Sequence, residues 1–174
     1  ISGASCAANE ILERDLDKLM KRTQNRPLPL KLISLQEALW VTSLVAVIGV
    51  GLLWYFTNPL TTWLGVLSMV LYVFVYTPLK RVGPVAVFVG AIPGALPPLL
   101  GWTAATGSIT HEALIIFGIQ FIWQFPHFWA IAWVSDEDYK RAGFKLLPNG
   151  GRKDFTTAVN IMIYTLFLLP LGLL

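Results

Sequence analysis

Three oxygen-bearing side chains near the start of the chain, Asn9, Glu13 and Asp17, are spaced four residues apart. A helix turns once in roughly 3.6 residues, so this spacing places all three on one face, about one turn from each other. Such a face suits a hard cation such as Mg²⁺, which takes few protein carboxylates and completes its shell with water and substrate phosphates. We therefore predict that Asn9, Glu13 and Asp17 bind Mg²⁺ within a catalytic site.

Basic residues follow closely, at Lys18, Lys21, Arg22 and Arg26. Their ammonium and guanidinium groups are suited to phosphate oxygens. Together with the acids they indicate a metal–diphosphate site, in which Lys18, Arg22 and Arg26 bind the diphosphate. An ordinary solvent-exposed helix is the alternative, because opposite charges four residues apart also pair with each other. This segment alone does not decide between the two.

The helix that carries these residues is expected to run to about 21–24. Pro27 and Pro29 favour an extended loop after it. Ser34 and Glu37 then stand three residues apart ahead of an apolar run, which is the capping-box pattern that begins a helix.

The rest of the chain has the composition of a membrane protein. Of its 174 residues, 55% are hydrophobic and 13% are charged, whereas soluble domains carry about 25% charged residues. Uncharged runs reach the roughly 20 residues that a membrane-spanning helix needs, and Thr57-Asn58-Pro59 divides the longest run. We predict an all-α, polytopic transmembrane bundle, with residues 1–174 forming a single domain that is incomplete at both ends. The expected spans are about 38–56, 60–76, 84–102, 113–134 and 155–174.

The positive charges indicate how the bundle is oriented. All 13 Lys and Arg residues fall in segments 14–31, 80–81 and 140–153, which five spans in series place on one side of the membrane. The positive-inside rule makes that side cytoplasmic. The net charge of +3 is therefore interpreted as topology and not as nucleic-acid binding. Lys80 and Arg81 are expected to reach the same diphosphate.

A second acid–base segment begins at Asp136-Glu137-Asp138 and continues with Lys140 and Arg141. Charged runs at the end of a span are usually only solvated. Two such segments on one side of an uncharged bundle favour a shared site, in which two carboxylate groups hold Mg²⁺ against one diphosphate. Asp136 and Asp138 are the candidate metal ligands, Asp138 also a catalytic candidate, and Lys140 and Arg141 the candidate diphosphate donors.

Two further features lie inside the predicted spans. Three prolines, from Pro93 to Pro98, predict irregular backbone that forms a cavity wall, while Gly90 and Gly94 make a GxxxG pair that favours helix packing. His127 stands on one helical face with Gln120 and Gln124. It is either a hydrogen-bonded structural histidine or a ligand of haem iron.

These residues resemble a known family. Asn9-x₃-Glu13-x₃-Asp17 is similar to the first acidic motif of the UbiA-type intramembrane prenyltransferases. The resemblance is strongest to the protohaem IX farnesyltransferases (haem O synthases) of that superfamily. Glu13 stands where the superfamily usually has Asp, and contiguous Asp136-Glu137-Asp138 replaces its second motif, Asp-x₃-Asp. The similar blocks are residues 9–17, 20–28, 76–81, 94–102, 126–130 and 138–148, in the family's order.

The resemblance implies a nine-helix prenyltransferase, of which this chain would hold the second to seventh helices. It implies Mg²⁺-dependent transfer of a farnesyl group from farnesyl diphosphate to a vinyl group of haem b, with addition of water, giving haem O and diphosphate for haem–copper oxidase biogenesis. It further implies a bacterial inner membrane, the lipid bilayer as surroundings, no nucleic-acid partner, and downstream haem-modifying or oxidase-assembly proteins. His127 is then the haem-binding candidate.

Other functions remain open at this stage. A related enzyme would prenylate an aromatic acid or a quinone precursor. A transporter would also use helices broken by Gly and Pro, but the acids here lie at span ends and not at the midplane. A structural membrane subunit would have no use for clustered acids.

Overall fold

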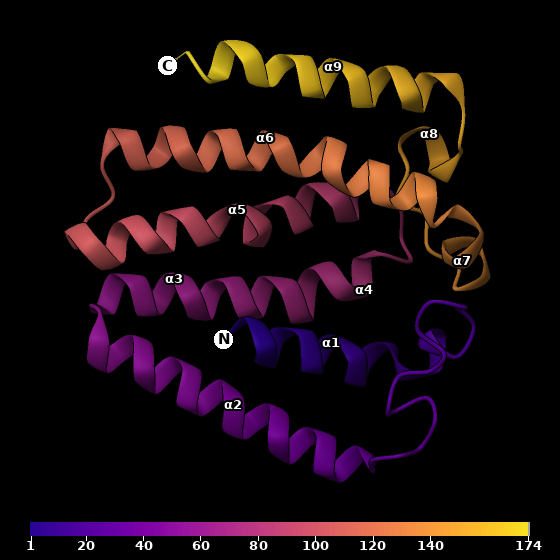
Figure 1. Cartoon of the computed structure of the whole chain (residues 1–174), viewed down its shortest axis with the longest axis horizontal. Helices are drawn as coiled ribbons and strands as arrows, with labels where there is room; N and C mark the ends of the chain where they lie inside the picture. Colours follow the sequence, from indigo (N-terminus) through magenta and orange to yellow (C-terminus); the bar gives the residue numbers. More distant parts are fainter. Residues whose placement is uncertain (174) are drawn as a thin grey trace.

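The computed structural model describes residues 1–173 and is helical, without strands over that range. The prediction of an all-α bundle is confirmed. The long helices run side by side along one direction (Figure 1). The elements are α1 (Ser2–Asp17), α2 (Leu35–Phe56), α3 (Pro59–Val70), η1 (Leu71–Tyr76), α4 (Thr77–Leu79), α5 (Val85–Thr106), α6 (His111–Val134), α7 (Asp136–Arg141), α8 (Pro148–Gly151) and α9 (Phe155–Leu171).

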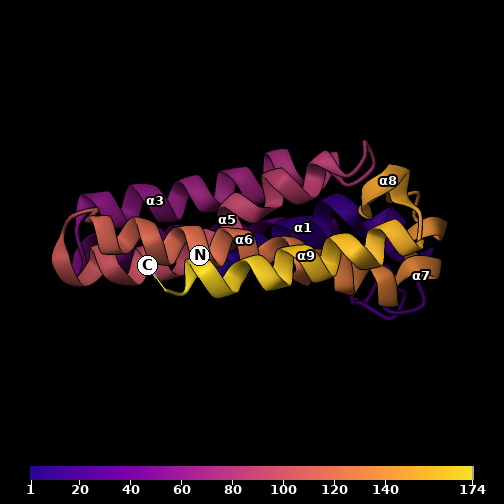
Figure 2. The same cartoon turned by 90° about the horizontal axis from the view of Figure 1, so that it is seen from above.

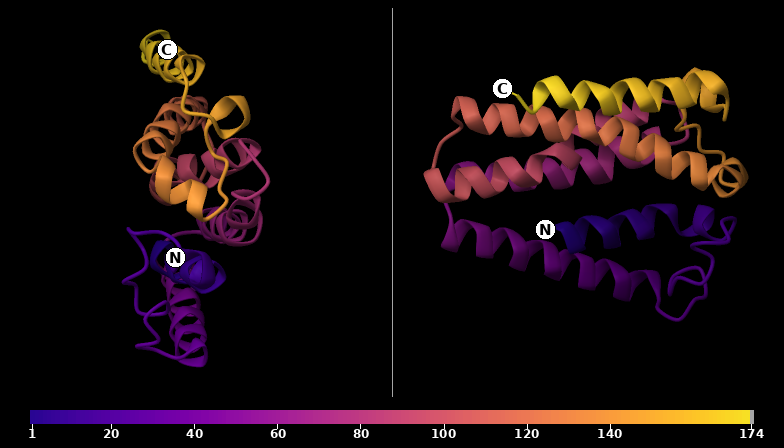
Figure 3. Two further views of the ribbon diagram at one scale, coloured as in Figure 1. Left: turned by 90° about the vertical axis from the view of Figure 1, so that its right-hand side faces the viewer. Right: turned by 45° about the horizontal axis from the view of Figure 1, so that its top comes forward.

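The helices form a band that is easiest to follow from its end (Figure 3, left). α5 packs against α6 and against α3, α6 packs against α9, and α1 packs against α2. α9 and α2 therefore lie at opposite sides of the band (Figure 1). One core cluster joins α5 and α6 to the charged end, where Met20, Phe144 and Leu146 are buried with Tyr76 and Trp129.

Four of the predicted spans are confirmed as helices long and apolar enough to cross a membrane. They are α2, the continuous helix Pro59–Leu79, α5 and α6. The fifth prediction falls on α9, a shorter apolar helix of 17 residues, and residue 174 lies outside the described residues. α2 begins where the capping box predicted, since Ser34 N donates to Glu37 Oε2 at 2.7 Å and Glu37 N donates to Ser34 Oγ at 3.2 Å.

α1 is shorter than predicted, because it ends at Asp17 instead of residues 21–24. The Thr23 hydroxyl donates to the Asp17 carbonyl oxygen at 3.1 Å, and the chain then continues in turns to Ser34. A side-chain donor on a terminal carbonyl replaces the next helical hydrogen bond. No local pattern predicts this helix end, because it depends on a hydrogen bond from Thr23, six residues further along the chain.

The helix that follows α2 changes its winding near its charged end. η1 is a π-helical segment, and the Thr77 hydroxyl donates to the Tyr72 carbonyl oxygen at 2.8 Å. π segments inside α-helices occur often at functional sites. Tyr72 and Tyr76 of this segment, with Lys80 directly after α4, line a cavity together with residues of α1.

The prediction of irregular backbone around the prolines is wrong: α5 is one continuous helix from Val85 to Thr106. Pro97 and Pro98 lack the N–H groups that would bond the carbonyl oxygens of residues 93 and 94. Ser68 donates to the first of these oxygens at 3.4 Å and Gln124 donates to the second at 2.7 Å. Neighbouring helices therefore supply the missing donors.

The glycine pair on α5 packs as predicted. A Cβ atom on Gly90 would lie 2.6 Å from the Tyr76 ring, and one on Gly94 would lie 2.6 Å from the Gln124 side chain. Both helices approach α5 more closely than any side chain there would allow. These contacts bring η1 and α6 together around α5.

The three basic segments lie at one end of the bundle. The turns after α1, the loop after α4, and α7 with α8 all lie at the right-hand end in Figure 1, and Figure 2 shows α7 and α8 there again from above. The turns around residues 58 and 108 lie at the other end. The shared side that the charge pattern predicted is thus present.

Candidate metal–diphosphate site

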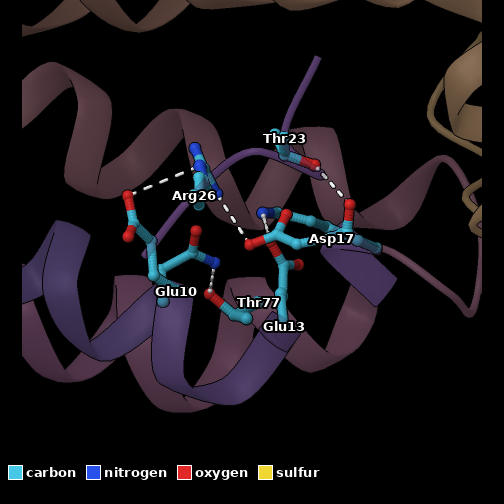
Figure 4. A network of polar contacts seen from close by, with 8 residues as sticks. Glu10, Glu13, Asp17, Thr23, Arg26 and Thr77 are labelled. Carbon is cyan, nitrogen blue, oxygen red and sulfur yellow. Dashed lines mark hydrogen bonds and ion pairs between the residues drawn. The ribbon is translucent and has the colours of Figure 1, made fainter. Parts of the chain in front are cut away.

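The three predicted metal ligands lie on the buried face of α1. Asn9, Glu13 and Asp17 are 7%, 5% and 0% exposed, and all three line one cavity of about 230 Å³. Their spacing of four aligns them along the helix, and Figure 4 shows Glu13 and Asp17 near Thr23 and Arg26 of the turns that follow α1. The predicted common face is confirmed, and the binding of a metal there stays a prediction.

Each acid forms an ion pair with a residue outside α1. Lys80 Nζ lies 3.0 Å from Glu13 Oε2, and Arg26 Nη1 lies 2.9 Å from Asp17 Oδ2. Arg26 also reaches Glu10, with Nε at 3.5 Å from Oε1 (Figure 4). The buried acids Glu13 and Asp17 therefore pair with residues of other segments, whereas the solvent-exposed interpretation required pairing along the surface of one helix.

The second oxygen of each carboxylate has no partner. Glu13 Oε1 and Asp17 Oδ1 are both buried, and neither accepts a hydrogen bond from any described residue. A buried acceptor without a donor costs free energy on the order of 1–3 kcal/mol, and more when it is charged. A cation bound between these residues would satisfy both oxygens, so the donor set fits a hard metal ion.

Asn9 completes the face through a contact to α4. Its Nδ2 donates to the Thr77 hydroxyl at 3.1 Å, and the same hydroxyl donates to Tyr72 in η1. The amide nitrogen is thereby fixed, and the amide oxygen is the atom that Asn9 could offer a cation. Thr77, whose contact with α1 is drawn in Figure 4, therefore joins the acidic face to the π segment.

Burial tunes the charged groups around the cavity. It lowers the pKa of the Lys80 ammonium, although the charge of Glu13 acts in the opposite direction. Burial also opposes the charge of Arg26, but the hydrogen bond and charge of Asp17, with help from Glu10 and Glu13, raise its pKa overall. Water therefore stabilises the Lys80 ammonium poorly, which favours an anion beside it, as the Glu13 carboxylate is at 3.0 Å.

The predicted diphosphate donors divide into two groups. Arg22, Arg26 and Lys80 line the cavity. Lys18 instead forms an exposed pair with Asp15 at 2.7 Å. Arg81 is exposed and is not among the residues that line the cavity.

The second acid–base segment lies apart from this cavity. Asp136 and Asp138 border another pocket of about 360 Å³, together with Glu137 and Arg141. Lys140 pairs with Asp136 at 2.7 Å within one turn of α7. Among the described residues, no group of three or more His, Cys, Asp or Glu side chains lies close enough to hold a metal ion.

Aromatic residues form much of the cavity wall, and none of them was among the site residues predicted from the sequence. Tyr72, Tyr76, Tyr139 and Phe128 line it with the charged groups. Burial raises the pKa of the Tyr139 phenol, which therefore stays a neutral hydrogen-bonding group. A signal existed: Tyr72, Tyr76 and Lys80 have the same four-residue spacing as the acids.

A second, more apolar cavity of about 350 Å³ adjoins the first. Tyr72 and Phe128 line both, and Pro93 and Pro97 lie in its wall. The predicted wall formed by the proline segment is confirmed. A charged compartment therefore opens beside an apolar one at the shared aromatic rings.

His127 lies in a groove on the outside of α6. Its ring stacks on Trp123, with centroids 4.3 Å apart and planes 16° apart. The groove, of about 510 Å³, contains His127, Val134 and also Arg22 and Ile131, which both line the charged cavity as well. The histidine is thus close to the candidate site and outside its cavity.

Comparison with known proteins decides the family. The UbiA prenyltransferase family model matches residues 1–174. The chain belongs to this family. The resemblance expected from the acidic motif is therefore confirmed, and no solved structure matches the chain.

Curated relatives of this UbiA chain are named protoheme IX farnesyltransferase. The protein from Cytophaga hutchinsonii is 53% identical over 166 residues, covering 95% of this chain and 58% of the relative. The one from Flavobacterium psychrophilum is 50% identical over 172 residues, covering 99% and 57%. The one from Koribacter versatilis is 44% identical over 173 residues, covering 99% and 56%. The chain thus spans less than two thirds of the length of these relatives.

Proposed function

We propose that the full-length protein transfers the farnesyl group of farnesyl diphosphate to a vinyl group of haem b, with addition of water, giving haem O and diphosphate. The names of the relatives support this substrate pair. The observation that carries the proposal is the pair of buried, unpartnered oxygens, Glu13 Oε1 and Asp17 Oδ1, in a cavity also lined by Arg22, Arg26 and Lys80.

The residues at this cavity fit Mg²⁺. Glu13, Asp17 and Asn9 would hold it with oxygen atoms, and the substrate diphosphate would complete its coordination. When bound, the metal supplies a positive charge that stabilises the charge growing on the departing diphosphate. Of the predicted ligands, these three line the charged cavity, whereas Asp136 and Asp138 border a separate pocket.

The chain's own cations also stabilise the negative charge on the departing diphosphate. Lys80 and Arg26 already stand beside the acids, and Arg22 lies at the cavity's exposed side. Fixed positive groups in a poorly solvated cavity stabilise a leaving anion more than the same groups in water. They lower the barrier to breaking the bond between the farnesyl carbon and the diphosphate oxygen.

The apolar cavity suits the farnesyl chain. It meets the charged cavity at Tyr72 and Phe128, which is where the reacting end of an allylic diphosphate would lie. The cation-like fragment left after the diphosphate departs must be kept from water. Aromatic faces at that junction stabilise positive charge by about 0.5–2 kcal/mol each.

The groove that holds His127 is the proposed place of the haem. An imidazole stacked on an indole offers both an iron ligand and a flat apolar surface. Arg22 and Ile131 belong to both the groove and the charged cavity, so an acceptor in the groove would border that cavity. A carboxylated acceptor would also find a cation in Arg22.

The test supplies the full-length protein with Mg²⁺ and farnesyl diphosphate, and with either haem b or 4-hydroxybenzoate. We expect farnesylated haem and no farnesylated aromatic acid, detected by mass spectrometry. His127→Ala should weaken haem binding more than farnesyl diphosphate binding. Product from 4-hydroxybenzoate alone would favour a prenyltransferase that acts on aromatic acids. Unchanged haem affinity would give His127 a structural role.

The charged end is proposed to face the cytoplasm of a bacterial inner membrane, because every Lys and Arg lies there. Single cysteines introduced near residues 24 and 145 should resist a membrane-impermeant thiol reagent added to intact cells. Cysteines near Asn58 and Thr106 should react. The opposite pattern would place the site on the other side.

A further inference from the structure

Asp138 makes a two-pronged contact with the turns that follow α1. The backbone N–H of Lys21 donates to its Oδ1 at 3.1 Å, and that of Arg22 donates to its Oδ2 at 3.1 Å. Arg141 also bonds Asp138 Oδ1, and through Nε it donates to the Leu19 carbonyl oxygen at 3.1 Å. Two side chains of α7 therefore hold the backbone at three positions, Leu19, Lys21 and Arg22, which lie 116 to 122 residues away in sequence.

The held segment is the one that carries donors to the cavity. Residues 18–26 form turns after the end of α1 and include Thr23, which bonds the Asp17 carbonyl, and Arg26, which pairs with the Asp17 side chain. Arg22 differs from Arg26, because its side chain has no hydrogen bond or ion pair to any described residue while it lines the cavity. Its position depends on its backbone, which Asp138 holds.

The same contacts bear on the metal. Asp138 borders a different pocket from Asn9, Glu13 and Asp17, and both of its oxygens accept backbone or guanidinium donors. Hydrogen bonds to an ionised carboxylate are roughly twice as strong as neutral ones. Releasing them to bind a metal would free the turns on which Arg22 stands.

We propose that Asp138 and Arg141 are positioning residues: they fix the turns after α1 so that Arg22 stands over the charged cavity and binds diphosphate. The inference rests on the proposed function for the identity of that ligand. An exposed arginine loses side-chain and backbone freedom when it binds an anion. A backbone that is already fixed lowers this cost. The contacts of Asp138 and Arg141, here called the clamp, therefore raise affinity for the diphosphate without touching it.

The test compares Asp138→Asn with Glu137→Gln in the full-length protein. Both remove one negative charge from α7 and preserve side-chain size. Glu137 is exposed and has no hydrogen bond to a described residue, whereas an asparagine at 138 offers one oxygen where two N–H groups need acceptors. Hydrogen–deuterium exchange is measured on peptides covering residues 18–26, and calorimetry measures the binding of inorganic pyrophosphate with Mg²⁺.

We expect faster exchange over residues 18–26 in Asp138→Asn and about tenfold weaker pyrophosphate binding, the loss of one hydrogen bond to a charged group. The Mg²⁺ concentration needed for half-maximal binding at saturating pyrophosphate should be unchanged. Glu137→Gln should match the wild type. Arg141→Gln, which retains Asp138, should change both quantities in the same direction by a smaller factor.

Unchanged exchange with a raised Mg²⁺ requirement would make Asp138 a metal ligand and overturn the proposal. Faster exchange with unchanged pyrophosphate affinity would also overturn it, because fixing the turns would then have no effect on pyrophosphate binding. Both measurements are independent of farnesyl transfer. A wild-type protein that binds pyrophosphate but leaves haem b unmodified would reject the proposed function alone.

Discussion

The acid–base segment that ends α1 and the one that forms α7 have similar composition, but they differ in depth. Glu13 and Asp17 are 5% and 0% exposed, and they pair with Lys80 and Arg26 from outside their helix. In α7 the pairing partner Lys140 keeps 63% of its side chain exposed and lies one turn from its acid. Charge pairing within one turn is a surface arrangement, whereas pairing between distant segments builds a cavity.

The unpartnered oxygens sharpen this difference. They occur on the two acids of α1, Glu13 and Asp17, while both oxygens of Asp138 accept donors. A buried ion pair with one free oxygen is poorly stabilised until a cation arrives. The first segment is therefore suited to binding a cation, and the second to holding the backbone of the turns after α1.

The largest expected effect comes from removing a free oxygen of the first segment. Glu13→Gln replaces a carboxylate by an amide that cannot neutralise Mg²⁺, and turnover of farnesyl diphosphate should fall by about 100-fold or more. Glu137→Gln, the matched change in α7, should leave turnover within about twofold, as expected for a surface substitution. Comparable losses in the two variants would remove the distinction between the segments. Membrane insertion of both is checked first.

The second effect is on stability without substrate. Arg26→Gln leaves the fully buried carboxylate of Asp17 without its cation, and since Arg26 is partly exposed we expect a loss of about 2–3 kcal/mol. Lys140→Gln breaks an exposed pair and should cost less than about 1 kcal/mol. The free energy of unfolding in mixed detergent micelles measures both. Equal losses would mean that the buried pair stabilises the fold no more than the exposed pair does.

The smallest effect lies inside the first segment itself. Lys18 follows directly after Asp17, yet it pairs with Asp15 in solvent. Lys18→Gln should change the KM for farnesyl diphosphate by less than about twofold, whereas Arg22→Gln should raise it by about tenfold through loss of a charged donor. A large rise in KM for Lys18→Gln would show that Lys18 also binds the diphosphate.

The sequence predicted those features that depend on local periodicity. The common face of Asn9, Glu13 and Asp17 follows from helical spacing, and the helices of four spans follow from the length of their apolar runs. The capping box at Ser34 is equally local. Each of these patterns lies within a few turns of chain.

What the sequence did not predict depends on contacts between distant residues. Lys80 and Glu13 are 67 residues apart, and no spacing rule selects that pair. α5 stays helical through its prolines because Ser68 and Gln124 come from other helices. The early end of α1 and the clamp by Asp138 have the same origin in tertiary contacts.

The most direct test of the central claim is a count of bound metal at the α1 face. Mn²⁺ accepts the same oxygen ligands as Mg²⁺ and its free form is measured by electron paramagnetic resonance. With inorganic pyrophosphate present, the full-length wild type and Glu137→Gln should bind Mn²⁺ equally, while Glu13→Gln should bind it at least about tenfold more weakly. Unchanged Mn²⁺ binding in Glu13→Gln, or loss of binding in Glu137→Gln alone, would contradict a metal site on α1.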